Sequence, residues 1–145
     1  MRTIIVSFLL MTAIVSVAQQ TEQDKEAIRR VIQESYVQGI HNKAGIALIE
    51  KGFHPGFEML GVQNGLLTRY PIYSWIETLK KASAQSSVAE VTAEIPLIDV
   101  AEDAAMARVE LFKEGKHLFT DYMSLYRFQE GWKIVAKIYY RIPEK

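Results

Sequence analysis

The C-terminal third of the chain constrains its fold more than any other segment, because it reads as consecutive β-strands joined by tight turns. The dipeptides Glu114-Gly115 and Glu130-Gly131 separate three runs rich in β-branched and aromatic residues. These runs predict strands over residues 104–113, 117–128 and 132–141. A long antiparallel meander therefore ends the chain.

The residues before the meander have helical periodicity. Thr21 to Asp24 has the form of a capping box, which predicts a first helix over residues 22–42. A short second helix is expected over residues 43–51, with Gly52 as its C-terminal cap. Pro71 suits the first turn of a third helix that ends at Lys80-Lys81.

Two further strand segments complete the pattern. Asn64-Gly65 is a strong two-residue turn signal and predicts a hairpin of short strands over residues 57–69. From Val88 the apolar period changes to two, which predicts another strand with Pro96 at a bulge or an edge. Helices followed by a long meander indicate an α+β domain, with one curved sheet wrapped over helices.

This order of elements resembles the nuclear transport factor 2-like superfamily, whose sheet curls into a cone. The segments Phe53-His54-Pro55, Phe119-Thr120-Asp121-Tyr122 and Gly131-Trp132-Lys133-Ile134-Val135 are most similar to its exported bacterial branch, called putative lumazine-binding. The resemblance implies a curved mixed or antiparallel sheet and a ligand in the mouth of the cone. It also implies a homodimer through the outer sheet face, and the branch name implies a pteridine-like heterocycle.

Residues 1–18 have the pattern of a secretory signal peptide. Arg2 precedes an apolar run over residues 4–17, and Ser16-Val17-Ala18 forms a small-residue cleavage site. The run is shorter than the roughly 20 apolar residues that a membrane-spanning helix needs. We expect cleavage after Ala18 and one periplasmic or secreted domain over residues 19–145, with no membrane attachment.

Composition and motifs exclude several classes of function. The 17 basic residues balance the 17 acidic residues, so nothing favours nucleic acid as a partner. The chain has no cysteine, and His41, His54 and His117 do not stand at a metal-binding spacing. Nucleophile-elbow, P-loop and dinucleotide-binding glycine motifs are absent from the sequence. We therefore expect no metal and no cofactor.

The superfamily includes ketosteroid isomerase, which uses a carboxylate base, a tyrosine and a protonated carboxylic acid. Alignment places Tyr36 on the isomerase tyrosine, Ser124 on the protonated acid and Gly61 on the base. Because glycine cannot accept a proton, that mechanism requires a substitute such as Glu58 or His54. The enzyme alternative is thus an isomerase or dehydratase that uses Tyr36 with His54 or Glu58.

A binding cavity is the favoured interpretation of the aromatic residues. If Ser124 faces inward, strict alternation places Tyr122 and Tyr126 inward too, where phenols can stack on and hydrogen bond a flat ligand. Trp75 is placed as a lid, and Phe57 and Met59 as the opposite wall. The alternative is that all of these side chains are ordinary core or strand residues.

Register counting from Glu114-Gly115 pairs Arg108 with Asp121, and we expect a surface ion pair there. The sequence predicts an exported, homodimeric, non-catalytic protein that binds a small hydrophobic or heteroaromatic molecule. A third alternative is an envelope protein-interaction module that uses Arg108, Glu110, Lys133 and Lys137 on the outer sheet face.

Overall fold

The computed structural model describes residues 19–81 and 89–143. The signal peptide expected over residues 1–18 lies outside the described residues. An α-helix over residues 19–31 continues into η1 (Ile32–His41), and it is followed by α2 (Ile46–Gly52), β1 (Phe53–Gln63), β2 (Leu66–Pro71), α3 (Ile72–Lys81), β3 (Val91–Ala101), β4 (Ala104–Lys113), β5 (Lys116–Phe128) and β6 (Gly131–Arg141).

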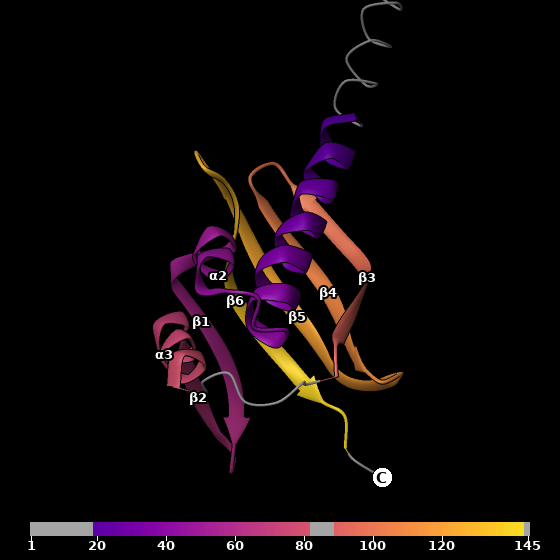
Figure 1. Ribbon diagram of the computed structural model, residues 1–145. Coiled ribbons are helices and arrows are strands. Elements are labelled where there is room, and N and C mark those ends of the chain that lie inside the picture. Colours follow the sequence, from indigo (N-terminus) through magenta and orange to yellow (C-terminus); the bar gives the residue numbers. More distant parts are fainter. Residues whose placement is uncertain (1–18, 82–88, 144–145) are drawn as a thin grey trace, which may run out of the picture.

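The strands form one six-stranded sheet in the order β2-β1-β6-β5-β4-β3, and the long N-terminal helix crosses one of its faces (Figure 1). β1 and β6 are parallel, and all other neighbouring strands are antiparallel. The predicted α+β class is confirmed. The predicted turns are also confirmed, since Asn64-Gly65 and Glu114-Gly115 both have the positive φ angles that such turns require.

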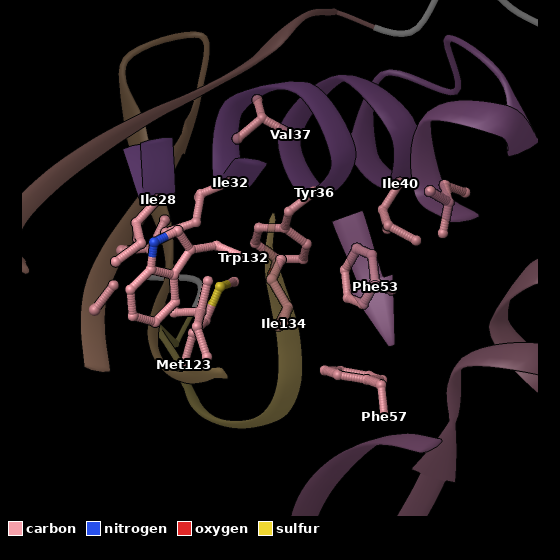
Figure 2. Close-up of a cluster of buried hydrophobic side chains, with 14 of the residues drawn as sticks. Ile28, Ile32, Tyr36, Val37, Ile40, Phe53, Phe57, Met123, Trp132 and Ile134 are labelled. Atoms are coloured by element: carbon pink, nitrogen blue, oxygen red, sulfur yellow. The ribbon is translucent and has the colours of Figure 1, made fainter. Parts of the chain in front are cut away.

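The core lies between the N-terminal helix and the sheet. The buried side chains of the helix face side chains of β1, β5 and β6 (Figure 2). The labelled residues of this core are Ile28, Ile32, Tyr36, Val37 and Ile40 from the helix and Phe53, Phe57, Met123, Trp132 and Ile134 from the strands. Burial at helical spacing explains why this segment was recognisable as a helix from the sequence.

The first helix begins earlier than the capping box predicted. Residues 19–31 are helical, so Thr21 lies within the helix and not at its N-cap. Asp24, the acidic residue of the expected box, is buried and accepts hydrogen bonds from Trp132 Nε1 at 3.1 Å and Arg127 Nη1 at 3.0 Å. The local prediction was wrong because this carboxylate pairs instead with Arg127 of β5 and accepts a hydrogen bond from Trp132 of β6.

The second half of the helix, η1, is a π-helix. Its backbone hydrogen bonds join residues five apart, and this pattern continues to the C-terminal cap, where Asn42 N donates to Val37 O at 2.9 Å. In an α-helix, residues five apart point about 140° away from each other, whereas the wider π turn brings them to nearly the same side. Tyr36 and His41 are five residues apart, and their rings meet edge to face at 4.7 Å between centroids.

α2 packs closely on η1 at two glycines. A Cβ atom on Gly52 would lie 2.1 Å from Ser35 Oγ, and one on Gly39 would lie 2.9 Å from Ile49 Cγ1. Gly52 is the last residue of α2 and does not have a positive φ. Its predicted role as a left-handed cap is therefore wrong, and close helix packing requires glycine instead.

Candidate functional site

A cavity of about 230 Å³ lies between η1, α3 and the sheet. Its lining comes from five elements and combines aromatic side chains with basic ones. The lining residues are Tyr36, His41, Met59, Trp75, Phe119, Lys137, Tyr139 and Arg141. Such a mainly apolar hollow with a few convergent polar groups is the usual form of a small-molecule site.

A buried polar triad lies at this cavity, and two of its members, Tyr36 and Lys137, line the cavity. Tyr36 Oη donates to Asp121 Oδ2 at 2.6 Å, while Lys137 Nζ donates to Tyr36 Oη at 2.7 Å and to Asp121 Oδ1 at 2.9 Å. Tyr36 and Asp121 have no exposed surface, and Lys137 is only 4% exposed. Each carboxylate oxygen therefore has a donor, as a buried charge requires.

The triad perturbs the ionisation of its members. Burial raises the pKa of Tyr36 well above its ordinary value, and the adjacent Asp121 carboxylate raises this pKa further. Burial also lowers the pKa of Lys137, although Asp121 opposes this change by stabilising the ammonium form. The phenol of Tyr36 is consequently a neutral hydrogen-bonding group.

A β-bulge in β6 turns Lys137 toward the cavity. Leu125 lies opposite Ile134 and Ser124 lies opposite Ala136, so Val135 is an extra residue in β6. Strict alternation from the buried Ile134 would direct Lys137 to the outer face. The extra residue reverses this alternation, so Lys137 and Tyr139 face inward. The expectation that Lys137 lies on an outer interaction surface is therefore wrong.

A second bulge, in β5, determines where Asp121 points. Phe119 lies opposite Leu111 and His117 lies opposite Phe112, so Leu118 is the extra residue. The register predicted from the turn holds only up to this bulge. Beyond it, Asp121 lies opposite the buried Val109 and faces inward.

This register corrects the predicted Arg108–Asp121 ion pair. Arg108 lies opposite Tyr122 and pairs instead with Glu110 of its own strand. Asp121 points to the opposite face of the sheet, where it joins the triad.

The same register places Tyr122, Ser124 and Tyr126 on the outer face of the sheet. All three are exposed, and the relative exposures of Tyr122 and Tyr126 are 41% and 50%. The inward orientation expected for them is wrong. Strands favour aromatic residues on either face, so the tyrosines themselves carried no information about direction.

Other predicted site residues are divided between the cavity and its surroundings. Tyr36, Met59 and Trp75 line the cavity, whereas Phe57 lies fully buried in the core at 6.5 Å from the Trp75 ring. His54 stacks on Phe128 outside the cavity lining, and its Nδ1 accepts from Gly56 N at 3.0 Å.

The carboxylates sought for catalysis do not line the cavity. Glu58 accepts from Arg69 Nη1 at 2.8 Å and is absent from the lining. Gly61 lies beside Tyr139, whose hydroxyl would be 3.1 Å from a Cβ at that position. The constellation of Tyr36 with His54 or Glu58 is therefore not assembled at this cavity.

His41 supplies an unused polar atom at the cavity. Its Nε2 is buried and has no hydrogen-bond partner among the described residues. Burial, with a smaller contribution from the Lys137 cation, lowers the pKa of His41 from 6.5 to about 4. The ring is thus neutral near pH 7 and can accept or donate one hydrogen bond through Nε2 according to its tautomer.

The aromatic walls surround the Lys137 ammonium. Nζ lies 4.9 Å from the ring centroid of Tyr36, 5.1 Å from that of Tyr139 and 5.5 Å from that of Trp75. Rings at these distances stabilise a cation through their quadrupoles. They also keep water from the amine on several sides.

Sequence reasoning missed five cavity residues, namely His41, Phe119, Lys137, Tyr139 and Arg141, and it missed Asp121 as the buried partner of Tyr36 and Lys137. Asp121 follows Phe119 and precedes Met123 at period two, so a single acid interrupts an apolar face. That pattern could have indicated a buried carboxylate. Lys137 carried no comparable signal, because an unseen bulge reverses its orientation.

The described residues contain no helix long and apolar enough to cross a membrane. Within the same ranges, no three histidine, cysteine, aspartate or glutamate side chains are placed to hold a metal ion.

The family model described as putative lumazine-binding matches residues 23–140, which include nearly all of the helices and of the sheet. The chain belongs to this family. A comparison with curated proteins found no match. Family membership confirms the resemblance seen in the sequence.

Solved structures show the same fold. An NTF2-like protein of unknown function from Shewanella baltica OS155 is 27% identical, with a TM-score of 0.69 and coverage of 84% of this chain and 96% of that one. An NTF2-like protein of unknown function from Silicibacter pomeroyi DSS-3 is 22% identical, with a TM-score of 0.69 and coverage of 84% and 98%. The predicted nuclear transport factor 2-like fold is confirmed.

A more distant structural neighbour bears an enzyme name. A putative ketosteroid isomerase from Shewanella frigidimarina NCIMB 400 is 14% identical, with a TM-score of 0.54 and coverage of 79% of this chain and 94% of that one. At this identity the likeness concerns the fold alone.

Proposed function

We propose that this protein is exported and binds a small aromatic or heteroaromatic molecule in the cavity without converting it. One observation carries the proposal: the cavity combines the rings of Tyr36, Trp75, Phe119 and Tyr139 with the buried Lys137 amine. Flat walls favour a flat ligand, and the amine provides a hydrogen-bond donor that fixes its orientation.

The size and polarity of the cavity restrict the ligand. Its volume of about 230 Å³ is below the roughly 300–1,000 Å³ of drug-sized sites, which favours a molecule of one or two rings. Lys137 Nζ makes two hydrogen bonds within the triad, so one ammonium N–H remains for a ligand acceptor. The His41 ring, which also lines the cavity, is a second group for a ligand to contact. The family description supports a pteridine-like heterocycle as the first candidate.

The hydrogen bonds argue against isomerase chemistry. The Tyr36 proton is directed to Asp121, so this phenol does not offer it to a ligand carbonyl. Asp121 is the acid that lies beside the tyrosine, and its oxygens are engaged by Tyr36 and Lys137. A base that accepts a substrate proton must reach that proton, and neither His54 nor Glu58 lines the cavity.

Native mass spectrometry of residues 19–145, purified gently from the exported fraction, tests the binding proposal. We expect a defined additional mass in the wild-type protein and in Leu60→Trp, a matched change on the same strand outside this cavity. Met59→Trp should fill the cavity and remove that mass. Retention of the same ligand by Met59→Trp would place binding elsewhere, and protein that never carries or binds a flat heterocycle would refute the proposal.

Export is supported by the residue pattern of positions 1–18. N-terminal sequencing of the protein from the periplasm or medium should begin at Gln19. A chain that stays in the cytoplasm with Met1 intact would contradict export.

We also propose a homodimer through the outer face of the sheet. The support is a row of exposed apolar and aromatic side chains on neighbouring strands, which is unusual for a face in contact with water only. These residues are Met106, Tyr122, Tyr126, Ile138 and Tyr140. Light scattering should give twice the chain mass, and Ile138→Glu should halve it, whereas Tyr73→Glu on α3 should not. A wild-type monomer would contradict the dimer and favour an interaction with another envelope protein.

A further inference from the structure

Lys137 differs from the other lysines of the described chain. It is the only one of them that is buried, and it lines a cavity, while the others lie at the surface or are partly exposed. Ordinary structural lysines keep their ammonium group in water and bury only the aliphatic stem. An amine inside an apolar cavity instead has the setting in which lysines act as nucleophiles.

The groups around Nζ are suited to moving its proton. Asp121 Oδ1 is 2.9 Å from Nζ, which is a hydrogen-bond distance and allows direct proton transfer. Tyr36 Oη is 2.7 Å from Nζ and also donates to Asp121. The rings of Tyr36, Trp75 and Tyr139 lie within 5.5 Å of Nζ and limit access by water.

We propose that Lys137 captures a small aromatic aldehyde or ketone as a reversible imine in this cavity. The inference rests on the proposed binding function and specifies its ligand class as a carbonyl compound held covalently. The lowered pKa of Lys137, caused by burial, supports it by making the neutral amine more accessible.

The reaction balances with the groups present. The Lys137 ammonium transfers a proton to the Asp121 carboxylate, and rotation about the Cε–Nζ bond directs the amine lone pair into the cavity. Nζ then attacks the carbonyl carbon, forming a C–N bond while the carbonyl π electrons move to oxygen. That oxygen takes a proton from Nζ to give a carbinolamine.

Asp121 next returns its proton to the carbinolamine hydroxyl, which leaves as water when the C–O bond breaks. The nitrogen lone pair forms the C=N bond of a protonated imine. This cation remains beside the Asp121 carboxylate, so the charges of the original ion pair are restored. No oxidant or reductant is needed, and addition of water reverses the process.

Reductive trapping tests the inference on the wild-type protein of residues 19–145. The protein is mixed with benzaldehyde and sodium cyanoborohydride near neutral pH, and modified lysines are located by peptide mass mapping. Lys133, on the same strand outside the cavity, serves as the internal reference. We expect Lys137 to be modified faster than Lys133, although Lys133 is the more exposed of the two.

A variant separates covalent capture from binding. Lys137→Arg keeps a cation next to Asp121 but cannot form an imine, so we expect it to lose the trapped adduct. Benzyl alcohol, which has no carbonyl group, should slow trapping at Lys137 by competing for the cavity and should not slow trapping at Lys133.

Each outcome has a distinct meaning. Preferential, competable labelling of Lys137 supports the inference, and labelling that follows surface exposure overturns it. If the protein carries a flat ligand but Lys137 is not labelled, covalent capture is refuted while the proposed binding function stands. If neither a ligand nor an adduct is found, both fail.

Discussion

His41 should make the stability of this fold depend on pH in a specific window. Its pKa is lowered from 6.5 to about 4, mainly by burial and secondarily by Lys137. Below pH 6.5, His41 therefore binds a proton more readily in the unfolded chain than in the folded protein, so acidification favours unfolding. At 1.36 kcal/mol per pKa unit, the difference corresponds to about 3 kcal/mol of unfolding free energy.

The sign and range of the effect follow from these two pKa values. The contribution of neutral His41 is complete above pH 6.5, decreases as the pH falls, and is lost below about pH 4. His41→Gln removes the titrating ring but leaves every other acid and base in place. The difference between the two proteins therefore isolates His41.

Urea unfolding of both proteins at a series of pH values from 7 to 4 measures the effect. We expect the wild type to lose about 3 kcal/mol more than His41→Gln over this range. An NMR titration of the wild-type ring should give a pKa near 4. Parallel stability curves, or a ring that titrates near 6.5, would refute the argument that burial keeps His41 neutral.

Three further changes test the packing around the site. Lys137→Met leaves the buried Asp121 carboxylate without its cation, and it should lower the free energy of unfolding, measured with urea, by roughly 3–5 kcal/mol. The double variant Lys137→Met/Asp121→Asn should recover most of that loss. A double variant no more stable than Lys137→Met would contradict the pairing. Gly52→Ala should lower the free energy of unfolding by about 1–3 kcal/mol, because its Cβ would lie 2.1 Å from Ser35 Oγ. The control Gly56→Ala, whose Cβ has its nearest contact at 3.2 Å, should cost less. Equal melting temperatures of the two variants would show that α2 can move away from η1. Asp24→Ala removes the acceptor for Arg127 and Trp132, so it should lower the free energy of unfolding by about 1–3 kcal/mol and increase amide hydrogen exchange in the N-terminal helix. Unchanged exchange would mean that the helix is held by its apolar face alone.

Local pattern was sufficient to predict most of the helices, strands and turns, although not the start of the first helix, its π turns or the bulges. The predicted hairpin turns, the meander and the helical segments depend on φ preferences of glycine and asparagine and on apolar periodicity, which act over a few residues. The strands predicted over residues 104–113, 117–128 and 132–141 agree closely with β4, β5 and β6. The family resemblance supplied the global arrangement.

The candidate site was only partly predictable. Tyr36, Met59 and Trp75 were expected to contact a ligand, and they do line the cavity. The charged members of the site were misplaced, since Asp121 was expected in a surface pair and Lys137 on an outer interaction face. An error of one residue in register reverses the direction of every following side chain. A strand whose first and last residues are predicted correctly can therefore still have its side chains assigned to the wrong faces of the sheet.

The sequence by itself therefore determined the class of fold, the turns and the apolar faces of the helices, because these follow from interactions between near neighbours in the chain. The tertiary structure alone decided which strand residues face the cavity and which residues of the first helix lie together. Extra residues at Leu118 and Val135 turn Asp121 and Lys137 inward, and the π turn of η1 brings His41 beside Tyr36. Bulges and π turns are selected by packing and pairing across the whole domain, and these long-range interactions leave little trace in local sequence pattern.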